Sequence, residues 1–131
     1  IHISKIPLIS LMILSKLRFN KILERRNQNI KTIYDKIYNH ERFLFDIEAI
    51  RSPFMLPLIF EDNERRENVR NLMLKHRIYP AIHWKIQGLI PEKFVYEHQL
   101  SSKELSIPID QRYSIEDMNR IINLLSKENL R

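Results

Sequence analysis

The clearest pattern in this sequence lies in residues 102–122, which read SKELSIPIDQRYSIEDMNRII. Residues 105–109 alternate as in a strand with one buried face, and they predict a β-strand. Ser114 stands three residues before Asp117, which resembles a capping box with Asp in place of the usual Glu. The helix predicted after this cap has one apolar face, formed by Ile115, Met118, Ile121, Ile122 and Leu125. The C-terminal end is therefore expected to be a strand that leads into an amphipathic helix.

A similar strand and helix are expected earlier in the chain. The apolar run 54–60 predicts a strand, and Pro57 within it favours an edge position, because proline cannot donate a hydrogen bond to a ladder. Asp62 or Asn63 can cap a following helix. The apolar stripe of that helix consists of Val69, Leu72 and Met73.

Between these two units, residues 78–86 predict a further strand. Residues 87–103 contain Gly88, Pro91 and a pair of serines, and they predict a long loop.

The N-terminal third predicts helix over residues 7–39, in one piece or in two, with Pro7 suited to a first helical position. Apolar side chains recur there at spacings of three and four residues, so they share one face. They are Phe19, Ile22, Leu23, Ile30, Ile33, Tyr34 and Ile37.

The resulting order favours the α+β class: a small, mainly antiparallel three-stranded sheet, covered on one face by helices and preceded by a long N-terminal helix. We expect residues 1–42 to form a basic helical segment and residues 43–131 to form the α+β domain.

Composition excludes several classes of protein. The 131 residues suit one domain, and the absence of cysteine excludes disulfide scaffolds and cysteine-based metal sites. Gly88 is the single glycine, whereas phosphate-cradling loops need several. The apolar run 6–14 is shorter than the roughly 20 residues that span a bilayer, so no membrane partner is expected. Because the chain starts at Ile1 without a recognisable signal peptide, we interpret it as a fragment of a longer cytoplasmic protein.

The net charge of +6 lies entirely in residues 1–42, which hold nine basic and three acidic side chains. A basic helix can bind phosphate backbones, meet an acidic partner or be solvated. The sequence signatures of RNA-binding sheets and zinc fingers are absent, so a nucleic-acid partner is not favoured.

No self-sufficient active site is visible in the sequence. There is no Gly-x-Ser-x-Gly elbow, and the five histidines lack the spacing of a helix-borne zinc site. Glu116 and Asp117 form a carboxylate pair, but their place at a helix start is explained by capping.

Four segments together resemble a known family. They are 25–29 (RRNQN), 78–84 (IYPAIHW), 101–110 (SSKELSIPID) and the Ser-x-x-Asp helix start at 114–117. In this order they resemble the C-terminal small domain of fold-type-I pyridoxal-phosphate (PLP)-dependent aminotransferases. The nearest group is the DegT/DnrJ/EryC1/StrS enzymes, which aminate sugar nucleotides.

The resemblance implies a parent enzyme that moves nitrogen from an amino donor, often glutamate, to a keto sugar through PLP. The family's Schiff-base lysine and cofactor site belong to a large domain that this chain lacks. None of the ten lysines here has a matching context, so the fragment alone is expected to be inactive and to bind no cofactor. The partners implied are that large domain, a second subunit in a homodimer and a small-molecule substrate.

The small domain of the family supplies one wall of the substrate cleft. By position, His83 and Trp84 match its substrate-facing His-Tyr pair, and Arg112 is a candidate for an anionic group of the substrate. The alternatives are that Trp84 belongs to the core, that His83 is a hydrogen-bonded strand residue and that Arg112 lies at a solvated helix entry. No catalytic or metal-binding residue is predicted.

Three hypotheses therefore remain: an aminotransferase small domain, a standalone basic nucleic-acid-binding domain, and a noncatalytic interaction or regulatory domain with the same fold. The first predicts an exposed apolar face where the large domain has been removed.

Overall fold

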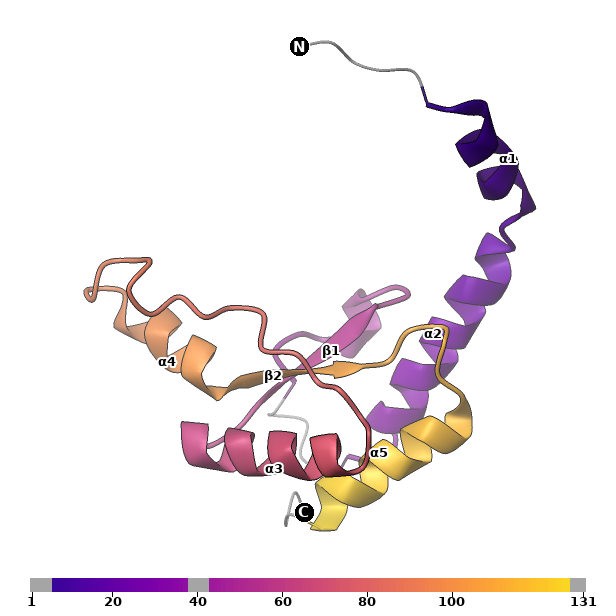
Figure 1. Ribbon diagram of the computed structural model, residues 1–131. Coiled ribbons are helices and arrows are strands. Elements are labelled where there is room, and N and C mark those ends of the chain that lie inside the picture. The colour runs from indigo at the N-terminus through magenta and orange to yellow at the C-terminus, as the bar shows by residue number, and fades with distance from the viewer. Residues whose placement is uncertain (1–5, 38–42, 128–131) are drawn as a thin grey trace.

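The computed structural model describes residues 6–37 and 43–127, and it has five helices of α type within them (Figure 1). The helices and strands follow in the order α1 (Leu8–Lys16), α2 (Phe19–Tyr34), β1 (Met55–Ile59), α3 (Asn63–Lys75), α4 (Val95–Lys103), β2 (Glu104–Pro108) and α5 (Ile115–Lys127). A 3-10 turn, η2 (Ile47–Ala49), precedes β1. The mixed α+β class expected from the sequence is confirmed.

Within the described residues the sheet has two strands, so the three strands expected from the sequence are not all found. β1 and β2 pair antiparallel, with Leu56 opposite Ile107 and Leu58 opposite Leu105. The predicted strand 78–86 is reduced to one bridge, in which Ala81 and Ser106 exchange two backbone hydrogen bonds of 2.9 Å. Because the N–H and C=O of Ala81 face β2, the backbone groups of Pro80 point away from β2, and this proline neither makes nor blocks a bond of the ladder.

Pro57 is accommodated in β1 by the same arrangement. It lies opposite Ser106, whose backbone N–H and C=O both bond to Ala81 on the other side of β2. Proline at this register position therefore leaves no bond to β2 unmade. β1 pairs with β2 on one side, and on its other side Leu58 forms one antiparallel bridge with Phe43, so the expected edge position is only partly free.

The segment 87–103 was predicted to be a loop, and its second half is instead the helix α4. This helix has no buried residue, so it lacks the apolar stripe by which sequence patterns identify helices. Its two serines, which suggest a turn in the sequence, donate to backbone carbonyls instead: Ser101 to Trp84 and Ser102 to Gln99.

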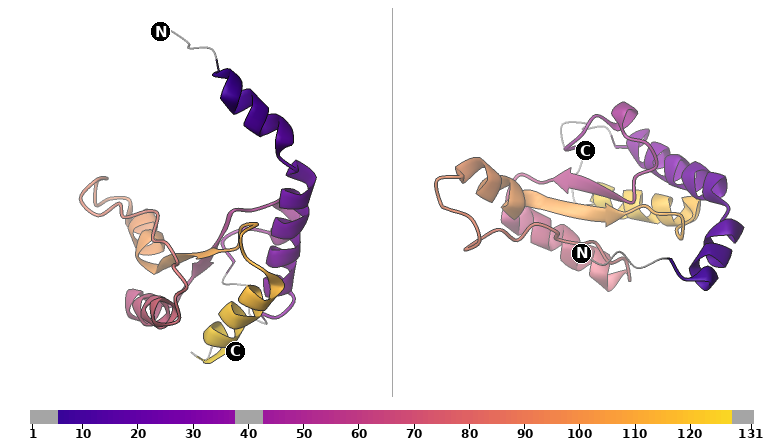
Figure 2. Two further views of the ribbon diagram at one scale, coloured as in Figure 1. Left: turned by 45° about the vertical axis from the view of Figure 1, so that its right-hand side comes forward. Right: turned by 90° about the horizontal axis from the view of Figure 1, so that it is seen from above.

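The core lies between the sheet and the helices. α3 and α5 lie on one side of the sheet and α2 packs against α5, as Figures 1 and 2 show. The capping box at the start of α5 is confirmed, because the Ser114 N–H donates to Asp117 at 2.9 Å and the Asp117 N–H donates to the Ser114 hydroxyl at 3.2 Å. The buried apolar side chains include Ile33, Leu58, Met73, Leu105, Ile107, Met118, Ile121 and Leu125.

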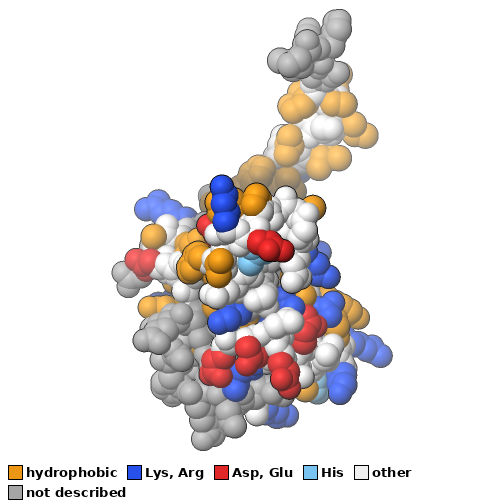
Figure 3. All heavy atoms as spheres, turned by 90° about the vertical axis from the view of Figure 1, so that its left-hand side faces the viewer, with side chains coloured by type: hydrophobic (Ala, Val, Ile, Leu, Met, Phe, Trp, Pro, Cys, Tyr) orange, Lys and Arg blue, Asp and Glu red, His pale blue; other side chains and the backbone are white. Residues whose placement is uncertain are grey.

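The N-terminal third is two helices rather than one. α1 ends at Lys16 and α2 begins at Phe19, while residues 38 and 39 of the predicted helix lie outside the described residues. α2 packs against α5 and buries Asn29, Ile30 and Ile33. α1 projects from the body of the molecule and buries none of its residues (Figures 1 and 3). No helix in the described part of the chain is both long and apolar enough to cross a membrane.

Candidate substrate-facing site

His83 and Trp84 lie in an irregular segment that leaves the sheet directly after the Ala81 bridge. Both residues are exposed, and Trp84 leaves 68% of its surface to solvent. The alternative in which Trp84 belongs to the core does not hold. The Trp84 carbonyl accepts a hydrogen bond from the Ser101 hydroxyl, which ties this segment to α4. The two predicted side chains are thus held together at the surface by contacts of the backbone.

A buried carboxyl group lies close to His83. Glu104 is only 3% exposed, and one of its oxygens accepts a 2.5 Å hydrogen bond from the Ser106 hydroxyl. Burial raises the pKa of the Glu104 carboxyl above its ordinary value, although the Ser106 bond and the nearby His83 and Arg66 lower it in part. An acidic side chain at this buried position was not predicted. The only signal in the sequence is the acid at the start of an otherwise apolar strand.

Arg112 is not brought together with His83 and Trp84. Since Ala81 pairs with Ser106, His83 lies near the start of β2, whereas Arg112 follows its end. The five residues of β2 alone separate these positions by about 13 Å. Arg112 instead donates to both carboxylate oxygens of Asp110, at 2.9 and 2.7 Å.

The Arg112 interaction orders the loop between β2 and α5. Asp110 is completely buried, while the Arg112 side chain is 70% exposed. The Arg112 hydrogen bond lowers the pKa of Asp110 below its ordinary value. Because Arg112 uses Nε and Nη2 for Asp110, its Nη1 group can still meet an anion from solvent.

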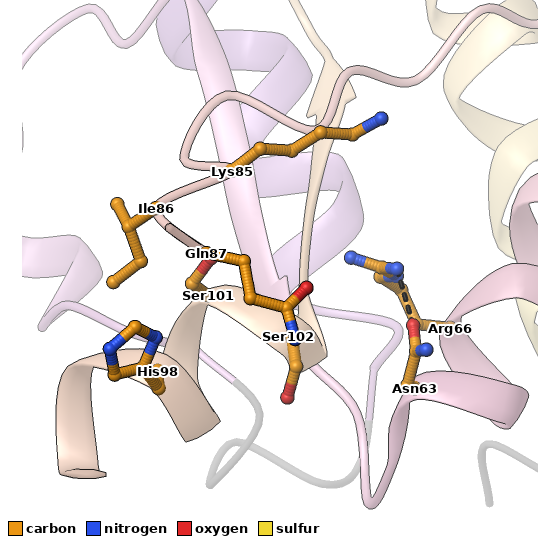
Figure 4. A pocket seen from close by; sticks show the side chains of 8 residues that line it. All are labelled: Asn63, Arg66, Lys85, Ile86, Gln87, His98, Ser101 and Ser102. Carbon is orange, nitrogen blue, oxygen red and sulfur yellow. Dashed lines mark hydrogen bonds between the residues drawn. The ribbon is translucent and has the colours of Figure 1, made fainter. Parts of the chain in front are cut away.

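A pocket of about 370 Å³ lies beside the His83–Trp84 segment, between that segment, α3 and α4 (Figure 4). Its lining includes the buried Arg66 and the exposed Lys85, and none of its lining residues is acidic. Sequence analysis missed this site because α4, which supplies three of its side chains, was expected to be a loop. The lining residues are Asn63, Arg66, Lys85, Ile86, Gln87, His98, Ser101 and Ser102.

Comparison with known proteins gives structural matches alone, since no family model and no curated protein sequence matches the chain. A putative sugar aminotransferase from Streptococcus pneumoniae, Spr1654, superimposes with a TM-score of 0.70 over 95% of this chain, at 16% identity. The sugar aminotransferase CalS13 from Micromonospora echinospora gives 0.62 over 84%, at 13% identity. This chain has the fold of part of a sugar aminotransferase. It covers 34% and 31% of the lengths of these two chains.

The same fold also occurs in an enzyme of different activity. GDP-4-keto-6-deoxy-D-mannose-3-dehydratase from E. coli, with bound hydrated PLP, gives a TM-score of 0.66 over 89% of this chain, at 14% identity. Likeness at this level of identity therefore establishes the fold and leaves the reaction to be argued from residues.

The described residues do not fit PLP as its primary binding site. Of the nine described lysines, eight are exposed and Lys103 is half-buried, whereas a lysine that reacts with the cofactor is activated by desolvation or a neighbouring cation in a pocket. Gly88 is the single glycine of the chain and lies in an exposed turn, whereas a loop that holds the phosphate of a cofactor needs several glycines. Among the described residues, no three His, Asp or Glu side chains gather as a metal site would require.

Proposed function

We propose that this chain is the C-terminal small domain of a PLP-dependent aminotransferase that acts on a sugar or nucleotide sugar. The observation that carries the proposal is the superposition of 95% of the chain on about a third of a putative sugar aminotransferase. In this proposal the domain forms one wall of the substrate cleft and is inactive without the large domain. The parent enzyme is a cytoplasmic homodimer.

His83 and Trp84 are the substrate-binding residues of the proposal. Their support is their joint exposure on an irregular segment next to the sheet, where an indole ring offers an apolar face and a polar N–H to a ligand. Arg112 has a separate role, which is to meet an anionic group of the substrate through Nη1 while Asp110 holds the rest of its guanidinium.

The large domain is the proposed partner of the N-terminal segment 1–42. The apolar surface of α1 supports this, because Leu8 is 80% exposed and Ile9 is 67% exposed. Exposed apolar area of this extent marks an interaction surface in soluble proteins.

The first experiment is to read the coding DNA upstream of the Ile1 codon. The expected result is an open frame that encodes a glycine-rich large domain with a candidate Schiff-base lysine. A start codon directly upstream would overturn the proposal, and a large domain without that lysine would replace it with a noncatalytic interaction domain.

The second experiment uses the full-length polypeptide and tests the residues. His83→Ala and Trp84→Ala are each expected to raise KM for the amino acceptor about tenfold, with the half-reaction of the amino donor unchanged, because only acceptor contacts are lost. Tyr79→Ala is the matched control, since Tyr79 is an aromatic residue that is 65% exposed and lies on the other side of the Ala81 bridge. Equal effects of Tyr79→Ala and Trp84→Ala would remove Trp84 from the substrate site.

A further inference from the structure

The pocket between the 85–87 segment, α3 and α4 contains features that the proposed function does not use. In Figure 4, Arg66 lies at one side and His98 at the other, with Gln87, Ser101 and Ser102 between them. Lys85 extends above Arg66 in this view. The lining thus combines two permanent cations, one histidine, two amides and two hydroxyl groups. Its volume of about 370 Å³ falls at the lower end of the range of small-molecule sites.

Arg66 is the central feature, because it is a buried cation whose hydrogen bonds are incomplete. Its side chain is only 9% exposed. Its Nη2 group donates to Asn63 and, at 2.7 Å, to Glu67, whereas its Nε has no hydrogen-bond partner among the described residues. A buried donor without a partner is unfavourable, and an acceptor group of a ligand that reaches this guanidinium would relieve that cost.

The charges around Arg66 leave an excess of positive charge at the pocket. Glu67 is shared between Arg66 and Arg70, the latter at 3.7 Å. Glu104 interacts with Arg66 electrostatically, and it is the first residue of β2, outside the pocket lining. Lys85 adds a further cation directly at the wall. The three cations Arg66, Arg70 and Lys85 thus outnumber Glu67 and Glu104, the two carboxyl groups that interact with Arg66.

The neutral groups favour a ligand with hydroxyl groups as well as a charge. The hydroxyls of Ser101 and Ser102 already donate to the carbonyls of Trp84 and Gln99, so they meet a ligand as acceptors. Lys85 and the amides of Asn63 and Gln87 can donate.

We propose that this pocket binds a small phosphate monoester, with the phosphate oxygens at Arg66 and Lys85 and hydroxyl groups of the ligand at Gln87, Ser101 and Ser102. The pocket consists entirely of residues of this chain, so the proposal does not depend on the proposed aminotransferase function.

The test is a titration of the 131-residue chain with glycerol 3-phosphate at constant ionic strength, followed by backbone amide NMR. Saturable shifts are expected at Gln87, Ser101 and Ser102. Inorganic phosphate is expected to bind more weakly, and glycerol to produce no shifts. Tighter binding of inorganic phosphate than of the ester would overturn the monoester assignment.

Two lysine variants provide the matched comparison. Lys85→Ala is expected to weaken binding about tenfold or more, as for the loss of one charge-assisted hydrogen bond. Lys93→Ala, an exposed lysine outside the pocket lining, is expected to change Kd less than about twofold. Arg66→Gln tests the role of the buried cation. Because that variant can fail to fold, the comparison of Lys85→Ala with Lys93→Ala tests the proposed binding without it. No saturable shift, or equal weakening by the two lysine variants, would overturn the proposal.

Discussion

The two N-terminal helices are adjacent in the chain and differ in every respect that governs burial. α1 (Leu8–Lys16) is apolar on all sides and buries none of its residues, whereas α2 (Phe19–Tyr34) is more polar and packs into the core. The difference shows that the distribution of apolar side chains around a helix, rather than their number, decides how it packs within one domain. A helix that is apolar all round requires partners on several sides.

α2 is held by a polar anchor as well as by its apolar stripe. The amide Nδ2 of the buried Asn29 donates to the carbonyls of Ile109, Asp110 and Tyr113, at 3.0–3.1 Å. Since an amide has two hydrogens, at least one of them is shared between two acceptors. α1 has no comparable contact in the described part of the chain, and it joins the body through Leu17 and Arg18.

The largest difference is expected from matched isoleucine truncations in the two helices. Ile33→Ala should lower the free energy of unfolding by about 2–5 kcal/mol, because Ile33 is fully buried and its loss leaves a cavity. Ile13→Ala in α1 should change it by less than about 0.5 kcal/mol, because Ile13 is 58% exposed. Urea unfolding measures both values. Comparable losses would mean that α1 also contributes to the folded core.

Removal of the polar anchor should have the next largest effect. Asn29→Ala is expected to lower the free energy of unfolding by about 1–3 kcal/mol, since two buried carbonyls and one partly buried carbonyl lose a donor. Gln28→Ala, at an exposed position of the same helix, is the control for changes in helix propensity. A loss in the control as large as that in Asn29→Ala would contradict the anchoring role.

The anchor of α2 should weaken in acid, because Asp110 supplies one of its carbonyls and pairs with Arg112. Folding lowers the pKa of Asp110 below its value of 3.8 in the unfolded chain. The Asp110 carboxylate therefore stabilises the fold at pH values above 3.8, and this stabilisation is lost as the pH falls through the pKa of the folded state. Glu104 acts in the opposite sense, because burial raises its pKa above the value of 4.5 in the unfolded chain. Its contribution to stability is present below pH 4.5 and is lost as the pH rises from there through the pKa of the folded state.

The variant Asp110→Asn separates the effect of Asp110 on the pH dependence of stability from that of Glu104. At about pH 6 the variant should be less stable than the parent chain, and the gap between them should narrow as pH falls below about 3.8. Urea unfolding at several pH values gives this comparison. A gap that stays constant with pH would show that the Asp110 charge has no role.

The smallest effect on unfolding is expected from polar substitutions on α1. Replacement of Leu8, Ile9, Met12 and Ile13 by Gln should leave the free energy of unfolding within about 0.5 kcal/mol, since all four side chains are exposed. The same variant should self-associate less than the parent chain in sedimentation velocity, because less apolar surface is exposed. Unchanged self-association would show that a surface other than α1 mediates it.

The elements that sequence analysis predicted well are those with strong local signals. The box formed by Ser114 and Asp117 and the five-residue apolar face of the final helix lie within a few residues of each other, and both were found where expected. Asp62, one of two predicted caps, indeed accepts from the Arg65 N–H at 2.7 Å. These features depend on neighbouring residues and so can be read from a short window.

The elements that it missed depend on distant contacts or on weak patterns. The strand at 78–86 was overextended, because among these residues only Ala81 forms a bridge to the sheet, and α4 was missed because it lacks an apolar stripe. The exposure of Trp84 and the burial of Glu104 follow from the path of the chain after Ala81, which local composition does not encode. The pocket beside Arg66 is formed by segments that start at positions 63, 85 and 98, and no sequence motif predicts that these segments lie together.

The hydrogen bond from Asn29 to Ile109 closes a span of 80 residues, and this has a consequence for synthesis on the ribosome. α2 emerges long before the carbonyls that hold it, at elongation rates of about 5–20 residues per second. For roughly 4 to 16 seconds the apolar stripe of α2 is without its final partner, next to the largely apolar α1. The newly made N-terminal segment therefore exposes apolar helix surface until the residues that hold α2 have been made.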